Sequence, residues 1–213
     1  MTGMGGAAGG RHGITAILLA AGSARRMRGR DKLLEDVRGR PALRHAAETA
    51  LASRADRVLV VLPPNAAPRR AALTGAAVEI VEAEDCAEGM AGSLRAGIAA
   101  VGPRADAVVI LLADMPEVGS QAIDRLIAAF DPAGGREIVR ATALDGTPGH
   151  PVLFGRRFFG RLSALTGDRG ARSIIEAVAA DCVAHVPTAG RAALVDLDTP
   201  EDWEAWRAER GGS

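Results

Sequence analysis

The segment ITAILLAAGSARRMRGRDK, residues 14–32, decides the fold of this chain. Its first part, 14–20, is a nearly continuous apolar run, which is typical of a parallel β-strand covered on both faces. The segment then changes to small residues at 20–23 and to a series of cations. A buried strand that ends in small residues and positive charge predicts an anion-binding loop at the carboxyl end of that strand.

Similar apolar runs follow along the chain, separated by stretches with helical spacing. We predict further strands at 57–62, 78–81, 107–112, 138–142, 151–154, 182–186 and 193–197. We predict helices at 41–53, 66–73, 92–101, 120–130, 156–163, 171–179 and from residue 200 onward. Because strands and helices alternate, the sequence predicts an α/β fold: a single-domain, Rossmann-like three-layer sandwich with a mostly parallel sheet.

Length and composition exclude several classes of protein. The 213 residues suffice for one domain with its own core, and we expect that domain at 14–210 after a disordered leader at 1–13. The 26 basic residues are matched by 26 acidic ones, so there is no excess of positive charge for nucleic acid or a membrane surface. No apolar run approaches the ~20 residues that a membrane span needs.

The cysteines and the charge distribution carry further information. Cys86 and Cys182 lie far apart and match no zinc-binding spacing, so we expect reduced, buried thiols in a cytoplasmic protein. The neutral total hides a local excess, since residues 25–40 contain seven bases and three acids, including Lys32, the only lysine of the chain. A triphosphate would suit this loop; a mobile loop with solvated arginines is the alternative.

Two common phosphate-binding motifs are absent from this loop. The P-loop motif G-x-x-x-x-G-K-[ST] fails because Lys32 is followed by Leu33. The dinucleotide fingerprint G-x-G-x-x-G fails because no glycine follows Gly22 before Gly29. A hydride-transferring dehydrogenase is therefore disfavoured.

The loop instead resembles the L-A-A-G-x-S-x-R-M-G-x-x-K signature of the cytidylyl- and guanylyltransferases of molybdenum cofactor biosynthesis and of related sugar or isoprenoid nucleotidyltransferases. The matching residues are Leu19, Ala20, Ala21, Gly22, Arg26, Met27 and Lys32. Ala24 replaces the serine of the signature, and one extra residue separates Met27 from Lys32. Other blocks resemble the cytidylyltransferase branch, in the same order: EGMAGSLRAG at 88–97, LADMP at 112–116, GTPGHPVLF at 146–154, GDRGAR at 167–172 and DLDTPED at 196–202.

Carried over residue by residue, the resemblance implies a site for a nucleoside triphosphate, a metal ion and a phosphate acceptor. The implied nucleotide-binding residues are Leu19, Ala20, Ala21, Gly22, Arg26, Lys32, Gly89 and Ser93. The implied catalytic residues are Arg26, Lys32 and Asp114, and the implied ligands of Mg²⁺ are Asp114 and Asp198. The implied acceptor-binding residues are His150, Asp168, Arg169 and Arg172.

Without the resemblance, several of these residues have simpler explanations. Asp114 follows a buried strand, where it can hold Mg²⁺ or satisfy the N–H groups of a turn. Gly89 can let a ligand approach or act as a hinge. His150 can be a structural residue in a turn, and Asp168 can be an N-cap.

The acidic block before the last helix also has a structural explanation. Thr199 fits the N-cap, Pro200 fits the first helical position, and Asp202 fits the third position of a capping box. Asp198 is not required by this cap, which leaves it available for a metal ion.

The resemblance implies a nucleotidyltransferase fold of the glycosyltransferase-A-like type and a Mg²⁺-dependent transfer of CMP from CTP to the terminal phosphate of molybdopterin, with release of pyrophosphate. Because the attacking phosphate is already anionic, the protein would supply positioning and charge neutralisation rather than a general base. Ala21 favours cytosine, since guanylyl-transferring relatives typically have glycine there and a methyl group would crowd a purine.

Partners and alternatives follow from the same resemblance. The implied partners are CTP or another NTP, a molybdopterin-type phosphate acceptor and a recipient molybdoenzyme or its chaperone. The charge balance separately predicts no nucleic acid and no membrane as partner. The nearest alternatives are the same chemistry with GTP, or with a sugar or isoprenoid phosphate as acceptor. A non-catalytic protein that binds and delivers the molybdenum cofactor is a further alternative.

Overall fold

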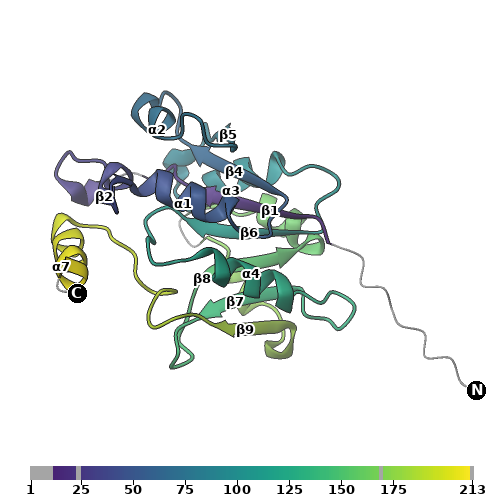
Figure 1. Ribbon diagram of the computed structural model, residues 1–213. Coiled ribbons are helices and arrows are strands. Elements are labelled where there is room, and N and C mark those ends of the chain that lie inside the picture. The colour runs from purple at the N-terminus through teal and green to yellow at the C-terminus, as the bar shows by residue number, and fades with distance from the viewer. Residues whose placement is uncertain (1–11, 23–24, 168–169, 212–213) are drawn as a thin grey trace, which may run out of the picture.

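A seven-stranded sheet runs through the molecule in the order β5-β4-β1-β6-β8-β7-β9 (Figure 1). The computed structural model describes residues 12–22, 25–167 and 170–211. The strands of this sheet are β1 (Ile14–Leu19), β4 (Arg57–Leu62), β5 (Glu79–Glu82), β6 (Ala107–Leu112), β7 (Ile138–Thr142), β8 (Pro148–Gly155) and β9 (Val183–Pro187). Strands β5, β4, β1 and β6 run parallel, β7 is parallel to β9, and β8 is antiparallel to β6 and β7. The predicted, mostly parallel sheet is confirmed.

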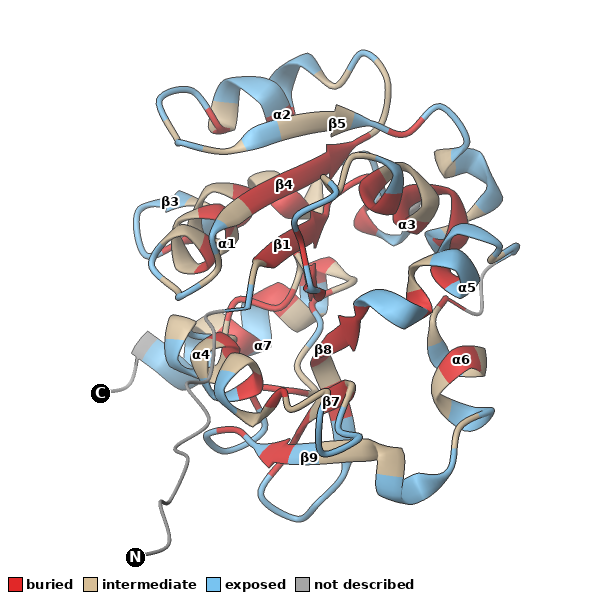
Figure 2. Cartoon of the chain, turned by 90° about the vertical axis from the view of Figure 1, so that its right-hand side faces the viewer, coloured by how far each residue is buried: buried red, intermediate tan, exposed pale blue. Residues whose placement is uncertain are grey.

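Helices cover both faces of the sheet, which Figure 2 shows with helices on either side. On one face lie α1 (Ala42–Leu51) and α4 (Ser120–Ala129); on the other lie α3 (Met90–Ala99), α5 (Phe159–Ser163) and α6 (Arg172–Glu176). Helix α2 (Ala67–Ala72) flanks the β5 edge, and α7 (Pro200–Gly211) lies beside the small hairpin of β2 (Asp36–Val37) and β3 (Arg40–Pro41) (Figure 1). This is the predicted three-layer sandwich.

The strands are buried on both faces, which explains their continuous apolar sequences. In β1, Ala16 and Leu18 belong to the apolar cluster under α1 and α4, whereas Ile17 and Leu19 belong to the cluster under α3. Helix α3 packs unusually close to β1, because a Cβ at Gly97 would lie 2.7 Å from Cγ2 of Ile17. The close packing of α3 brings its first turn to the carboxyl end of β1.

The second half of the chain differs from the prediction in several places, among them the shorter helix α6, which ends at Glu176 rather than at residue 179. The strand predicted at 193–197 is wrong: the Leu194 N–H closes a turn onto Arg191, and the Leu197 N–H donates to the carbonyl of Asp114 at 3.1 Å. The backbone of this segment therefore forms hydrogen bonds within a turn and to the loop after β6, and it forms no ladder of hydrogen bonds with another strand. The predicted helix at 156–163 divides into a 3₁₀ turn, η4 (Arg156–Phe158), and α5, because the Phe159 N–H bonds to Arg156. Strand β8 is longer than the predicted 151–154, since Pro148 pairs with Thr142 of β7.

The predicted leader at 1–13 lies outside the described residues except for its last two. Of these, Gly13 donates its N–H to the carboxylate of Asp106 at 2.9 Å. Cys86 and Cys182 are free thiols, and they are half-buried rather than buried as predicted. None of the described helices combines the length and the apolar character that crossing a bilayer requires.

Candidate active site

A cavity of about 720 Å³ opens at the carboxyl ends of β1 and β6. This is the edge at which parallel α/β sheets bind their ligands. The cavity is lined by Leu19, Ala20, Gly22, Arg26, Lys32, Leu33, Cys86, Ala87, Gly89, Met90, Ser93, Leu112, Asp114, Asp196 and Asp198. All residues predicted to bind nucleotide or metal therefore line one cavity, with the exception of Ala21.

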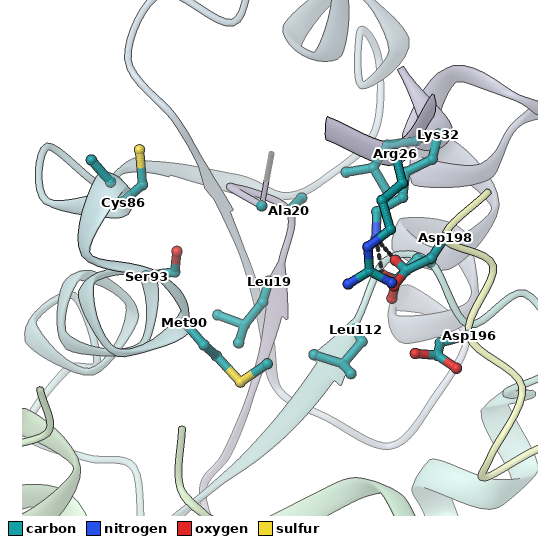
Figure 3. A pocket seen from close by; sticks show the side chains of 15 residues that line it. Leu19, Ala20, Arg26, Lys32, Cys86, Met90, Ser93, Leu112, Asp196 and Asp198 are labelled. Atoms are coloured by element: carbon teal, nitrogen blue, oxygen red, sulfur yellow. Dashed lines mark hydrogen bonds and ion pairs between the residues drawn. The ribbon is translucent and has the colours of Figure 1, made fainter. Parts of the chain in front are cut away.

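The two ends of the cavity differ in chemistry (Figure 3). Arg26, Lys32 and Asp198 lie together at one end, and Ser93 lies with other residues of η3 (Cys86–Glu88) and α3 at the other. The last residues of β1 and β6 lie between these ends. A ligand with a strongly charged part and a flat, weakly polar part, as in a nucleoside triphosphate, would suit such a cavity.

The charged end is a network of two cations and two carboxylates. Lys32 Nζ lies 2.5 Å from Oδ2 of Asp114 and 2.6 Å from Oδ1 of Asp198. Arg26 Nη1 lies 2.8 Å from Oδ2 of Asp198. The Lys32 side chain is only 12% exposed, whereas that of Arg26 is 72% exposed. Lys32 is thus the inner cation and Arg26 the outer one.

The protonation state of Lys32 follows from its two acidic neighbours. Burial by itself lowers the pKa of the Lys32 ammonium. The charges and hydrogen bonds of Asp114 and Asp198 outweigh burial and raise this pKa above its ordinary value. Lys32 is therefore a permanent cation at neutral pH.

The start of α7 positions Asp198. The predicted capping box is confirmed, because the Thr199 N–H donates to the Asp202 carboxylate at 2.8 Å and the Asp202 N–H donates to Oγ1 of Thr199 at 3.2 Å. The Asp202 carboxylate also accepts the N–H of Asp198 at 3.2 Å. These hydrogen bonds lower the pKa of Asp202, with the Thr199 hydroxyl as the main cause. The Asp198 carboxylate takes no part in the cap and faces Lys32.

Asp114 and Asp198 fit a divalent cation. Both carboxylates contact the same ammonium, so their oxygens already surround one cation position. Mg²⁺ in nucleotide sites takes one or two carboxylates and completes its shell with phosphate oxygens and water. Within the described residues, no group of three or more His, Cys, Asp or Glu could hold a metal ion. The remaining ligands would therefore come from a bound nucleotide and from water.

Small residues shape the end of the cavity near α3. Gly89 has φ of +91°, a conformation that favours glycine, and it immediately precedes α3 while lining the cavity. A Cβ at Gly92 would lie 2.0 Å from the carbonyl oxygen of Asp85, so this glycine serves the packing of α3 on η3. Ala21 is buried in the apolar cluster that contains Leu94 of α3, and its side chain does not line the cavity.

Of the predicted acceptor-binding residues, the structure describes His150 and Arg172, and neither lines this cavity. His150 is near Asp114 but lines a separate small cavity, and burial together with the charge of Arg140 lowers the pKa of His150 to about 4. The imidazole is therefore neutral at neutral pH. Arg172 is 75% exposed and pairs with Glu176 at 2.7 Å. Asp168 and Arg169 lie outside the described residues.

Two arginines near the site were missed by the sequence analysis. Arg140 is half-buried on β7, where burial and the nearby Arg172 lower its pKa. Arg69 of α2 is 7% exposed and contacts the loop that follows β1. No motif marks either residue, because 25 of the 26 basic residues are arginines.

Comparison with known proteins identifies the family. The model of the "MobA-like NTP transferase domain" matches residues 16–185. The chain is 30% identical over 204 residues to the purine catabolism protein PucB of Bacillus subtilis (strain 168), with 91% of this chain and 96% of that protein covered. It is 31% identical over 164 residues to the nicotine blue oxidoreductase of Paenarthrobacter nicotinovorans, with 75% and 79% covered.

A solved structure agrees with this relationship. Rv0371c from Mycobacterium tuberculosis H37Rv is 32% identical, with a TM-score of 0.79 over 92% of this chain and 98% of that one. A structure of the same protein in complex with manganese has a TM-score of 0.75. Matched over most of its length in both sequence and structure, the chain belongs to the family of the MobA-like NTP transferase domain and is a nucleotidyltransferase of that type.

Proposed function

We propose that this protein transfers CMP from CTP to the terminal phosphate of a molybdopterin-type acceptor and releases pyrophosphate. The observation that carries the proposal is the network of Arg26, Lys32, Asp114 and Asp198 at one end of a nucleotide-sized cavity. The family relationship supports nucleotidyl transfer as the class of reaction. The blocks of sequence that resemble the cytidylyltransferase branch support CTP and molybdopterin as substrates.

The residues of the network have distinct roles in this proposal. Arg26 and Lys32 neutralise the β- and γ-phosphates, which leave as pyrophosphate. Asp114 and Asp198 hold the metal, which when bound supplies electrostatic stabilisation of the charge that develops on the phosphates. The manganese complex of the relative Rv0371c supports a divalent ion, and we infer Mg²⁺. His150, Asp168, Arg169 and Arg172 are proposed to contact the acceptor.

The proposal requires Lys32 to change partners. In the free protein its ammonium contacts the same two carboxylates that would hold the metal. Two cations cannot both occupy the position between these carboxylates. With a metal–nucleotide complex bound, Asp114 and Asp198 would hold the metal, and Lys32 would pair with phosphate oxygens instead. The long, flexible lysine side chain permits this exchange.

The proposed preference for cytosine rests on the sequence resemblance, in which guanylyl-transferring relatives typically have glycine at the position of Ala21. The Ala21 side chain itself packs in the apolar cluster beneath α3 and does not line the cavity. We further propose that the protein is cytoplasmic, in keeping with its free thiols. Its next partner would be a recipient molybdoenzyme or the chaperone of that enzyme.

The test is a measurement of pyrophosphate release with each of the four NTPs, with molybdopterin and with sugar and isoprenoid phosphates as acceptors. We expect Mg²⁺-dependent release with CTP and molybdopterin. Asp114→Asn should lower turnover about 100-fold or more, because an electrostatic contact to the reacting phosphates is lost. Asp181→Asn, at an exposed position on the short turn before β9, is the matched control.

Two results would overturn the proposal. If Asp114→Asn turned over at the wild-type rate, the reaction would not depend on the proposed metal site. Tight binding of Mg-CTP by the wild-type protein without any product would favour a non-catalytic protein that binds and delivers the cofactor. A preference for GTP, or for a sugar or isoprenoid phosphate as acceptor, would overturn the proposed substrates but not nucleotidyl transfer as the class of reaction.

A further inference from the structure

Arg69 makes an unusual set of contacts for a residue on a short surface helix. Its side chain is almost fully buried, and its guanidinium donates to both carboxylate oxygens of Asp31, at 2.7 and 3.0 Å. It also donates to the carbonyl of Ala20 at 2.6 Å and to the carbonyl of Gly22 at 3.2 Å. Every side-chain hydrogen bond that Arg69 makes with described residues thus goes to the loop between β1 and η2 (Lys32–Leu34).

These contacts join the two ends of that loop. Ala20 and Gly22 immediately follow β1, whereas Asp31 immediately precedes Lys32. Asp31 is also the N-cap of η2, since its carboxylate accepts the Leu33 N–H at 3.1 Å. The guanidinium of Arg69 therefore holds Asp31, the residue that caps η2, and Lys32 is the first residue of η2.

The contacts also orient the backbone at the start of the loop. In a planar trans peptide the carbonyl and the following N–H point in opposite directions. Because the Ala20 carbonyl faces Arg69, the Ala21 N–H points away from α2. Arg69 thereby selects which backbone groups the loop can offer to an anion.

The neighbouring arginine behaves differently. Arg70 is 42% exposed and pairs with Glu82 on the surface, at 2.5 Å. A surface ion pair of this kind contributes little to stability or to the shape of a loop. Of two adjacent arginines, only Arg69 reaches the loop that carries Lys32.

We propose that Arg69 is a positioning residue of the nucleotide site. It holds Ala20 and Gly22 at one end of the loop between β1 and η2 and Asp31 at the other, and in this way it fixes the position of Lys32. The proposal rests on nucleotide binding as proposed above and adds a residue that touches neither substrate nor metal. In this proposal the extra residue between Met27 and Lys32 does not change the position of Lys32. Asp31 anchored by Arg69, rather than the length of the loop, determines where the lysine begins its turn.

The single lysine of the chain allows a direct test. We would measure the rate at which Lys32 is acetylated in the native protein by acetic anhydride, with mass spectrometry of peptides to separate Lys32 from the N-terminal amine and from the second lysine of Arg69→Lys. The variants are Arg69→Met, Arg69→Lys and Asp31→Asn, with Arg70→Met as the matched control. Binding of Mg-CTP by calorimetry and the separate values of kcat and KM complete the measurements.

We expect acetylation of Lys32 to become at least about tenfold faster in Arg69→Met and Asp31→Asn, because the ammonium leaves its two carboxylates more often. The Kd for Mg-CTP should rise about tenfold. The value of kcat should fall up to about 100-fold, as for other small misplacements of a catalytic group. Arg69→Lys should not restore these values, since an ammonium cannot bind Asp31 with two parallel hydrogen bonds and also reach two carbonyls.

The outcomes separate this proposal from the proposed function. If wild-type protein binds no Mg-CTP, the proposed function fails while acetylation of Lys32 still tests the role of Arg69. If Arg69→Met does not fold, Asp31→Asn gives the same test, because asparagine keeps one oxygen for the cap on Leu33 and removes both the charge and one of the two oxygens that accept from Arg69. Acetylation and nucleotide binding at the level of Arg70→Met in the folded variants would overturn the proposal.

Discussion

Lys32 balances the charge of two carboxylates that would otherwise attract a metal ion. Its ammonium lies within hydrogen-bonding distance of both Asp114 and Asp198, in a largely buried position. Opposite charges at such short distance in a partly buried site interact strongly. The same side chain therefore has two uses in the proposed function: it neutralises the acids in the free protein and the phosphates in the complex.

Removal of this cation should change metal binding in the absence of nucleotide. We expect Lys32→Met to bind free Mn²⁺ about tenfold more tightly than the wild-type protein, because two unbalanced carboxylates remain. Electron paramagnetic resonance of unbound Mn²⁺ during a titration gives the affinity. Lys32→Arg, which keeps the charge, is the control. Equal or weaker Mn²⁺ binding by Lys32→Met would show that the lysine and the metal do not compete.

His150 predicts a dependence of stability on pH. Its folded-state pKa of about 4 lies below the ordinary 6.5, so the fold favours the neutral imidazole. This contribution to stability is complete above pH 6.5 and is lost as the pH falls through about 4, because the unfolded chain then binds the additional proton. The loss amounts to at most about 3 kcal/mol for such a shift.

Urea unfolding of the wild-type protein and of His150→Gln between pH 7.5 and pH 4 tests this contribution. We expect the free energy of unfolding to fall less steeply with decreasing pH in the variant, which has no imidazole to protonate. His185, exposed on β9, provides a control substitution, His185→Gln. Identical slopes for wild-type protein and His150→Gln would contradict the expectation.

At the scale of elements, α7 connects helix capping with the site. Its first turn holds the backbone of Asp198, and its buried Trp203 packs in a cluster with Met27, the residue after Arg26. Arg28 pairs with Glu201 of the same helix at 2.6 Å. The C-terminal helix thus holds both the segment that carries Asp198 and the loop that carries Arg26.

Loss of the cap should therefore affect both stability and metal binding. Thr199→Ala removes the hydroxyl that accepts the Asp202 N–H, and we expect it to lower the free energy of unfolding by about 1 kcal/mol. We also expect weaker binding of Mn-CTP, measured by calorimetry, since Asp198 precedes the cap directly. Thr199→Ser keeps the hydroxyl and should resemble the wild-type protein. An unchanged Mn-CTP affinity in Thr199→Ala would mean that Asp198 is held independently of the cap.

The elements differ in how well their sequence predicted them. Strands β4, β6 and β7 begin and end at the predicted residues. Each is a short, mostly apolar run with polar residues or turns on both sides. Helix ends were less accurate: α1 and α3 have no side-chain cap that a sequence motif could mark. The apolar residues at 193–197 resemble a strand, but their backbone groups bond to Arg191 and Asp114 and to His150 instead.

At the scale of the whole molecule, the site joins distant parts of the chain. Lys32 is 82 residues from Asp114 and 166 residues from Asp198 in sequence. Local sequence patterns predict Asp114 beyond the end of a strand and Asp198 before a helix. Only the resemblance assigns these two acids to a common site. That Lys32 contacts both acids became evident only when the three segments were seen together.

The sequence by itself determined the α/β sandwich and the position of a loop of small and basic residues after the first strand. Both depend on the spacing of apolar, small and charged residues among near neighbours, which is a local property of the chain. The tertiary structure alone decided that Lys32 stands between two carboxylates, that Arg69 is buried against the loop and that residues 193–197 form no strand. Burial and pairing of polar groups depend on which distant segments meet, and no local pattern encodes that.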